Sequence, residues 1–295
     1  RARIEAAIAL AKSPTLMVIG GAAHPFEKCA AIFKSAMEVG GVFSIEVTED
    51  RGALVDLSTY DAVAIYTGGG EMSADQERGL IEFVRAGGGL VAIHCANAAM
   101  EKYPDYLEMV GTEFVGHGPI AEFGIETSDQ ASHILPRLSS GFTVTDEFYK
   151  LERRTEAELT EFQHGTWQFD RQVMGYVRDF GEGRVFYTAL GHDERTFRHP
   201  DFQDQVYKGL RYACGMKEGP PIRMGLLGYG PAFGMGEHHS QRIADTQGFE
   251  LAAVCDVDEV LSDTQVTNIV SSNPVDLHSS TTIGGQTILS SAACG

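Results

Sequence analysis

Three histidines, His24, His94 and His192, each come at or just after the end of an apolar run that the sequence predicts to be a β-strand. Because open parallel sheets bind ligands at the carboxyl ends of their strands, we expect the three side chains to lie at one edge of one sheet. A neutral imidazole binds metal ions, and the same ring transfers protons near neutral pH. Each histidine alone is equally consistent with a loop residue that caps a helix, but the three together predict a site for acid/base or metal-assisted chemistry.

Residues 87–99, GGGLVAIHCANAA, raise the question of whether a cysteine nucleophile lies where a strand turns into a helix. The residue at the tip of such a strained turn needs small residues two positions before it and two positions after it. For His94 both positions hold alanine, whereas for Cys95 they hold isoleucine and asparagine. We therefore predict that His94 occupies the tip and that Cys95 is a buried packing residue, as free cysteines commonly are.

A second glycine-rich stretch follows an apolar run in the sequence IRMGLLGYGPAFGMGEHH. Its spacing departs by one residue from the dinucleotide-binding pattern, in which glycines bring a pyrophosphate onto a helix N-terminus. An acidic residue at the end of the next apolar run, 249–258, stands where the ribose hydroxyls of NAD(P) would bind. The residues that would bind this cofactor are Gly228, Gly230, Gly234 and Asp256. An ordinary packing turn between a strand and a helix is the alternative.

The elements that must position the histidines alternate along the first part of the chain. Predicted strands span 15–21, 43–50, 61–70 and 89–95, with predicted helices at 25–41 and 73–89. This order predicts a parallel sheet with helices on both faces. From about residue 110 to 180, alternating strands predict an insertion or an extension of the sheet. A buried strand at 183–193 and a helix at 200–215 then close the first domain.

Composition excludes several classes of protein. The 295 residues carry a formal net charge of −18. This charge disfavours a binder of nucleic acid or anionic membranes, because phosphate groups require clustered Lys and Arg. We expect a cytoplasmic protein, since no apolar run is long enough to span a membrane and the start lacks the apolar core of a signal peptide. Because the chain begins at Arg1, removal of an N-terminal leader is kept as an alternative. Five scattered cysteines suit a reducing compartment.

A stretch of charge, glycine and proline at 216–221 predicts a boundary between two domains. We expect an N-terminal extension at 1–13, a first domain at 14–215, a linker at 216–221, a partial dinucleotide-binding unit at 222–262 and a Ser/Thr-rich tail at 263–295. The tail shows little helical periodicity, and we predict no particular structure for it.

Several motifs of the first domain resemble the ThuA-like (trehalose utilisation) family. They are YTGGGEM, GGGLVAIHCA, FVGHGP, DEFY and GEGRVFYTALGHD, in this order, within residues 14–215. The resemblance implies a flavodoxin-like layer similar to that of class I glutamine amidotransferases, and a role in carbohydrate metabolism. It does not imply ammonia transfer from glutamine, because that reaction needs a cysteine at the position where His94 stands.

The resemblance also implies a set of site residues. These are His24, Glu71, His94, His117, Asp146, Glu147, Tyr149 and His192. His117 is as consistent with a turn residue, and the adjacent Asp146 and Glu147 with an exposed acidic pair. If both acids lie on a strand, they point to opposite faces and only one can easily enter the site. The single tryptophan, Trp167, would stack on a sugar ring or, more commonly, belong to the core.

Residues 222–262 resemble the N-terminal unit of the Gfo/Idh/MocA oxidoreductases, which act on sugars with NAD or NADP. The resemblance fades after residue 262, where the later strands and the substrate domain of that family are missing. We therefore do not expect a working dehydrogenase. We interpret this incomplete Rossmann βαβ unit as part of a truncated or disrupted fusion.

Three hypotheses of function follow. The leading one is an enzyme that acts on a small-molecule carbohydrate, a (keto-)disaccharide or glycoside, by acid/base or metal-assisted chemistry. A zinc-like divalent ion held by His24, His94 and His192 is the expected cofactor of the metal-assisted form. The alternatives are a non-catalytic sugar-binding module and an NAD(P)-dependent sugar oxidoreductase acting through the C-terminal segment. We expect no nucleic acid or membrane partner, and we keep assembly into a homo-oligomer as an alternative.

Overall fold

The computed structural model describes residues 12–216, 222–227, 235–245, 249–255, 269–271, 279–283 and 286–290. The chain divides into two compact units, Arg1–Lys217 and Glu218–Gly295. All of the residues that the sequence predicts for the acid/base or metal site belong to the first unit.

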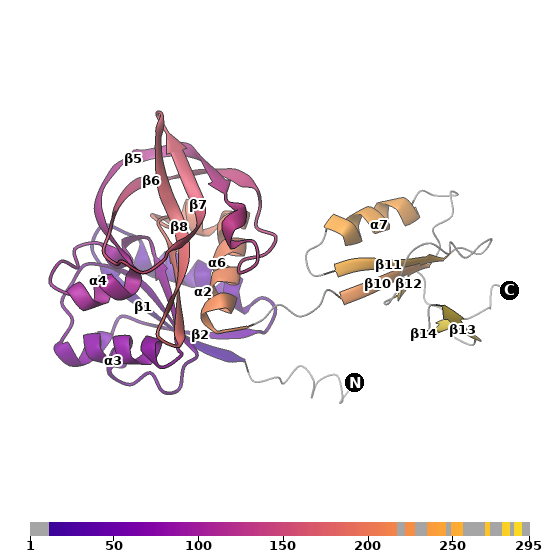
Figure 1. The fold of residues 1–295 in the computed structure, drawn as a ribbon, viewed down its shortest axis with the longest axis horizontal. Coiled ribbons are helices and arrows are strands. Elements are labelled where there is room, and N and C mark those ends of the chain that lie inside the picture. The colour runs from indigo at the N-terminus through magenta and orange to yellow at the C-terminus, as the bar shows by residue number, and fades with distance from the viewer. Residues whose placement is uncertain are drawn as a thin grey trace. The chain divides into compact units, whose positions relative to one another are not determined.

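The first unit is built on one open sheet of nine strands, in the order β2-β1-β3-β4-β9-β8-β7-β5-β6. Figure 1 shows β5, β6, β7 and β8 of this sheet side by side. The parallel half consists of β1 (Ser13–Gly21), β2 (Phe43–Thr48), β3 (Ala62–Gly68), β4 (Gly89–Ile93) and β9 (Gly183–Thr188). The antiparallel half consists of β5 (Thr112–Thr127), β6 (Gly141–Arg153), β7 (Thr160–Trp167) and β8 (Asp170–Phe180). The segment predicted as an insertion or extension thus extends the same sheet, and β9 joins the two halves.

The central parallel strands form because their sequences are continuous apolar runs. All five residues of β4 are buried, and so are the first six of β3. A strand that is covered on both faces needs such a run, whereas a strand with one wet face alternates. This pattern places β3 and β4 in the interior of the first unit.

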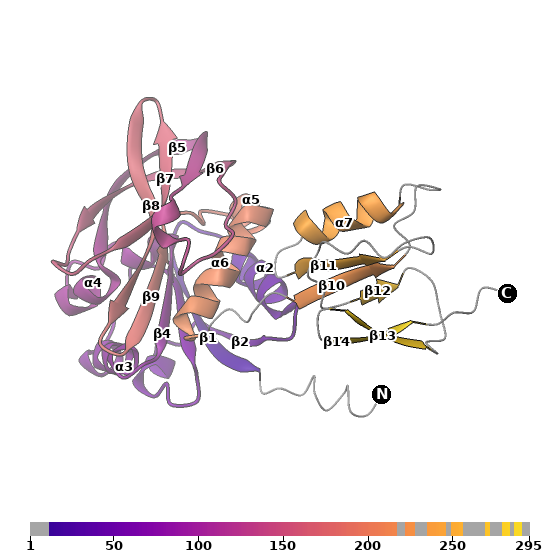
Figure 2. The ribbon, with the colours of Figure 1, turned by 45° about the vertical axis from the view of Figure 1, so that its right-hand side comes forward.

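Helices cover the parallel half on both faces (Figure 2). On one face lie α2 (Phe26–Glu38) and α6 (Pro200–Ala213), and on the other lie α3 (Ala74–Arg85) and α4 (Pro104–Val110). The predicted start of α3 is confirmed, because Ser73 and Gln76 form a capping box. Short helical segments complete the unit: α5 (Glu194–Phe197) and 3₁₀ turns at Arg51–Val55, His94–Asn97 and Asp129–Ala131. The predicted flavodoxin-like α/β sheet with helices on both faces is therefore confirmed.

The second unit begins with β10 (Ile222–Leu227), α7 (Met235–Asp245) and β11 (Phe249–Cys255). β10 pairs in parallel with β11 and with β12 (Ile269–Ser271). In the predicted tail, β13 (Ser279–Ile283) and β14 (Gln286–Ser290) form an antiparallel pair. The residues predicted to bind NAD(P), namely Gly228, Gly230, Gly234 and Asp256, lie outside the described residues.

The topology of the first unit decides where a ligand can bind. β1 is flanked by β2 on one side and β3 on the other, so the connections that leave β1 and β3 diverge above the sheet. In flavodoxin-like sheets this switch point, at the carboxyl ends of the strands, is where ligands bind. None of the helices in the described part of the chain is long and apolar enough to cross a membrane.

Candidate functional site

The three predicted histidines converge at the carboxyl ends of β1, β4 and β9. Their candidate ligand atoms all lie within 4.8 Å of one another. The ring of His24 is 4.9 Å from the ring of His94 and 4.9 Å from that of His192, centroid to centroid. Because the three residues come from loops up to 168 positions apart in the chain, only the parallel sheet brings them together.

His94 occupies the tip of the sharp turn that follows β4. Its φ of 50° lies in the left-handed region, which residues other than glycine rarely adopt and which the surrounding structure must impose. The ring is fully buried, and its Nδ1 is 2.6 Å from the carbonyl oxygen of Ala189. Since a carbonyl only accepts, Nδ1 carries the proton and Nε2 presents a lone pair to the centre of the site. Tyr149 stacks on the ring at 4.1 Å, centroid to centroid.

Cys95 follows the tip and faces the interior. Its side chain is buried, and burial raises the pKa of its thiol well above the usual range. A thiol in this state is a poor nucleophile, because the thiolate is the reactive form. The spacing of small residues predicts this arrangement, with His94 at the tip and Cys95 packed behind it.

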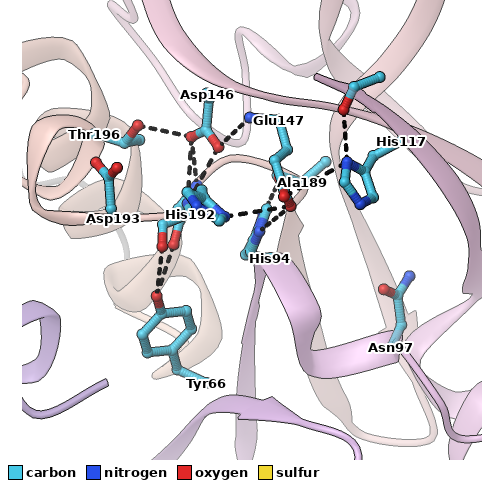
Figure 3. Close-up of polar contacts among 12 residues, drawn as sticks. Tyr66, His94, Asn97, His117, Asp146, Glu147, Ala189, His192, Asp193 and Thr196 are labelled. Atoms are coloured by element: carbon cyan, nitrogen blue, oxygen red, sulfur yellow. Dashed lines mark hydrogen bonds and ion pairs between the residues drawn. The ribbon is translucent and has the colours of Figure 1, made fainter. Parts of the chain in front are cut away.

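Glu147 of β6 faces the histidines from the antiparallel half of the sheet (Figure 3). Its Oε2 lies 3.3 Å from Nε2 of His94 and 3.3 Å from Nδ1 of His192. Burial would raise the pKa of Glu147, but the imidazoles of His192 and His94 hold it well below its usual range. In turn, the Glu147 carboxylate raises the pKa of His192. Burial, together with the neighbouring His94 and His192, lowers the pKa of His24 to about 4.

Three buried ring nitrogens of the site have no hydrogen-bond partner among the described residues. They are Nδ1 of His24, Nε2 of His94 and Nδ1 of His192. The last two face Glu147 at ion-pair distance, but not in the geometry of a hydrogen bond. A buried polar atom that is left unpaired costs roughly 1–3 kcal/mol, so three at one point require an explanation. Three imidazoles with ligand atoms within 4.8 Å of one another are a donor set that fits a zinc-like divalent ion, and the Glu147 carboxylate faces two of them.

Asp146, directly before Glu147, is fully buried and serves the backbone of the site. Its carboxylate accepts hydrogen bonds from the N–H groups of Gly191 and His192. The sequence predicts that only one member of the acidic pair easily enters the site. In the structure the imidazoles face Glu147, while Asp146 holds the loop that carries His192.

Two further predicted residues lie away from the three imidazoles. His117 stands at the rim, with 42% of its side chain exposed and its Nδ1 3.5 Å from Oε1 of Glu147. Glu71 is 84% exposed, and its carboxylate pairs with Lys102 at 3.1 Å. A position shortly after a strand does not fix the direction of a side chain. Glu71 follows β3, but its side chain pairs with Lys102 at the surface.

Trp167 packs within the first unit. Its ring lies 6.1 Å from that of Phe148, centroid to centroid, and its benzo edge lies against Gly118. Phe148 belongs to the buried core, so the more common of the two interpretations of Trp167, a core residue, is the one that this packing favours.

Sequence reasoning missed Tyr66 and Thr196, which both hold the loop after β9. The hydroxyl of Tyr66 donates to the carbonyl of Gly191 at 2.8 Å, and that of Thr196 donates to Asp146 at 2.7 Å. The sequence does indicate that Tyr66 needs a hydrogen-bond partner, because its hydroxyl lies in an apolar run that forms a buried strand. It does not indicate which residue is that partner, because Gly191 is far away in the chain.

The first unit matches known proteins over most of its length. The family model for ThuA, trehalose utilisation, matches residues 15–213. Solved structures of ThuA-like proteins from Parabacteroides merdae and Bacteroides uniformis resemble it, with TM-scores of 0.63 and 0.59 at 20% and 15% identity. Both alignments cover 70% of this chain, and they cover 91% and 93% of those chains.

A β-galactosidase from Bacillus circulans sp. alkalophilus shares the fold of the same region, with a TM-score of 0.50 at 14% identity, over 70% of this chain and 31% of that enzyme. A search of the curated proteins finds no match. At these identities the structural likenesses establish the fold alone. The family model, however, covers more than half of the 295 residues, so the chain belongs to the ThuA (trehalose utilisation) family.

Proposed function

We propose that the first unit is an enzyme of sugar metabolism that acts on a (keto-)disaccharide or glycoside by metal-assisted acid/base chemistry. The observation that carries the proposal is the convergence of three imidazoles, each with a buried nitrogen that has no hydrogen-bond partner among the described residues, at the carboxyl edge of the sheet, with Glu147 facing two of them. The family description, trehalose utilisation, supports a sugar as the substrate. The buried, high-pKa thiol of Cys95 argues against a cysteine-dependent amidotransferase.

His24, His94 and His192 would hold the ion, with Glu147 as a neighbouring carboxylate. Two observations favour this role. The pKa of about 4 keeps His24 neutral at pH 7, and the hydrogen bond of Nδ1 to Ala189 leaves Nε2 of His94 as the nitrogen that faces the centre of the site. When bound, a zinc-like ion supplies a Lewis acid that polarises an oxygen of the sugar.

Proton transfer falls to the residues around this centre. Glu147 stays ionised at neutral pH, so it stabilises positive charge on His192, whose pKa it raises. His117 lies beside Oε1 of Glu147 and is partly exposed, so it reaches both the site and solvent. We assign His117 the transfer of a proton between the substrate and water, which an imidazole performs near pH 7.

Metal analysis of the purified chain tests the proposal. We expect about one divalent ion per native chain, and a loss of at least tenfold in metal content in His94→Ala, because an ion that loses one of three imidazoles is held much more weakly. His133→Ala is the matched control, since His133 is exposed. Equal metal content in all three proteins would overturn the metal-assisted form of the proposal.

Turnover decides between an enzyme and the sugar-binding module. A panel of disaccharides, glycosides and their keto forms is offered to the native chain, and binding heat and product are measured on the same samples. We expect conversion that His94→Ala reduces by at least 100-fold. Binding without conversion in the native chain would favour the non-catalytic module instead.

A further inference from the structure

We infer that Asp146 is a positioning residue that sets where the ring of His192 stands relative to His94 and Glu147. The inference rests on the proposed function, because it concerns the same site. Asp146 itself does not face the three unpaired ring nitrogens. Its hydrogen bonds go to the backbone that carries one of them, so it acts through His192.

The carboxylate of Asp146 binds two consecutive backbone amides of the loop that follows β9. Oδ2 accepts from the N–H of Gly191 at 2.8 Å, and Oδ1 accepts from the N–H of His192 at 3.1 Å (Figure 3). The hydroxyl of Thr196 on α5 donates to Oδ2 at 2.7 Å. Of these bonds, those from Gly191 and Thr196 are buried and that from His192 is partly buried, and carboxylate oxygens are strong acceptors.

The opposite side of the same loop is fixed as well. The hydroxyl of Tyr66 donates to the carbonyl oxygen of Gly191. Gly191 has a φ of 132°, and a Cβ at this position would come within 3.0 Å of Ile93 and 3.3 Å of His94. The loop therefore passes through a space that only glycine fits, held by Asp146 at its N–H groups and by Tyr66 at its carbonyl.

Asp146 and Glu147 belong to β6, in the antiparallel half of the sheet, whereas His192 follows β9 of the parallel half. The N–H of Glu147 also donates to Oδ1 of Asp146, at 2.7 Å. Two neighbouring residues of one strand thus bind the loop and face the imidazole that it carries. Asp146 thereby fixes the separation between the carboxylate of Glu147 and the ring of His192.

Asp146→Asn tests this role with Co²⁺ as the probe. The substitution is nearly isosteric, but an amide NH₂ replaces an acceptor that faces an N–H group, so the loop loses its anchor. We expect Co²⁺ affinity to fall about 10- to 100-fold, as is typical when a group that orients a metal ligand is removed. We also expect the visible absorption of bound Co²⁺ to change, while the thermal transition stays cooperative. Asp170→Asn is the control, because Asp170 pairs with Lys150 on the surface and should leave both values unchanged.

A measurement without metal separates this inference from the proposed function. Hydrogen exchange at the amides of Gly191 and His192 should be at least tenfold faster in Asp146→Asn than in the native chain. Thr196→Val removes one contact of Asp146 and keeps both amides, so it should produce smaller changes in the same direction even if Asp146→Asn does not fold. If the native chain binds no Co²⁺, the metal proposal fails while amide exchange still decides the role of Asp146. Native-like exchange, or native-like Co²⁺ binding, in a folded Asp146→Asn would overturn the inference.

Discussion

At the residue scale, His94 combines a predictable feature with one that the sequence does not contain. Alanines two positions to either side indicate the strained turn, and the φ of 50° agrees with them. The tautomer depends instead on the carbonyl of Ala189, which is 95 positions away and reaches the ring only because β9 pairs with β4. Local sterics are visible in a sequence, whereas a ring's protonation state depends on neighbours that folding supplies.

The low pKa of His24 predicts a pH dependence of stability in the metal-free protein. The folded pKa of about 4 lies below the usual 6.5, so between these values the unfolded chain binds more protons. Stability due to neutral His24 is therefore complete above pH 6.5 and is lost as pH falls toward 4. We expect a loss of about 2 kcal/mol, after allowance for partial exposure. His24→Ala should show a correspondingly flatter dependence in urea unfolding from pH 4 to 6.5, and parallel curves would contradict this.

The buried thiol of Cys95 predicts a packing role. Cys95→Ala removes one buried sulfur, so we expect a loss of about 1 kcal/mol in the free energy of unfolding, measured in urea. Metal content and turnover should stay within twofold of the native values, because the thiol is protonated and lies behind His94. Loss of turnover in a stable Cys95→Ala, with His94→Ala still active, would return the nucleophile assignment to the cysteine.

At the scale of elements, the alternation of apolar runs and amphipathic stretches is sufficient to predict β1 to β4, α2, α3, β9 and α6, whereas the short helix α4 was not predicted. The pairing of β9 with β4 is not predictable in the same way, because the partners of these two strands lie about 95 residues apart and leave no local pattern, whereas β8 and β9 form a local hairpin. The position of Glu147 depends on this pairing. Its place among the candidate residues came from the resemblance of DEFY to the family, and not from periodicity.

The loop between β9 and α5 predicts a sharp sensitivity to added side-chain volume. Gly191→Ala combines a left-handed backbone with contacts of 3.0 Å to Ile93 and 3.3 Å to His94. We expect it to cost about 2–4 kcal/mol in thermal or urea unfolding and to weaken metal binding at least tenfold. Gly41→Ala is the matched control, because Gly41 has a φ of 68° but nothing within 4 Å of a Cβ. It should cost about 1 kcal/mol and leave metal binding unchanged, and an equal effect of both variants would contradict the crowding argument.

At the scale of the whole molecule, the candidate site lies entirely within one of the two compact units. Its histidines, Glu147 and the residues that hold them come from β1, β3, β4, β6, β9 and the segments after them, all in Arg1–Lys217. The second unit contributes the prediction of NAD(P) binding, whose residues lie outside the described part of the chain. The two predicted chemistries are therefore separable by experiment.

A chain that ends at Lys217 should keep the metal site. The nine-stranded sheet and its covering helices belong to this unit, so we expect it to fold without the later residues. We expect the same metal content per chain as in the full-length protein and a Tm within about 2 °C of its main transition.

Titration of NAD⁺ and NADP⁺ into both chains, followed by calorimetry, tests the prediction of a nucleotide site in the second unit. Binding to the full chain that is lost in Asp256→Ala would support a nucleotide site in the second unit, whereas loss of metal on truncation would show that the two units share one site.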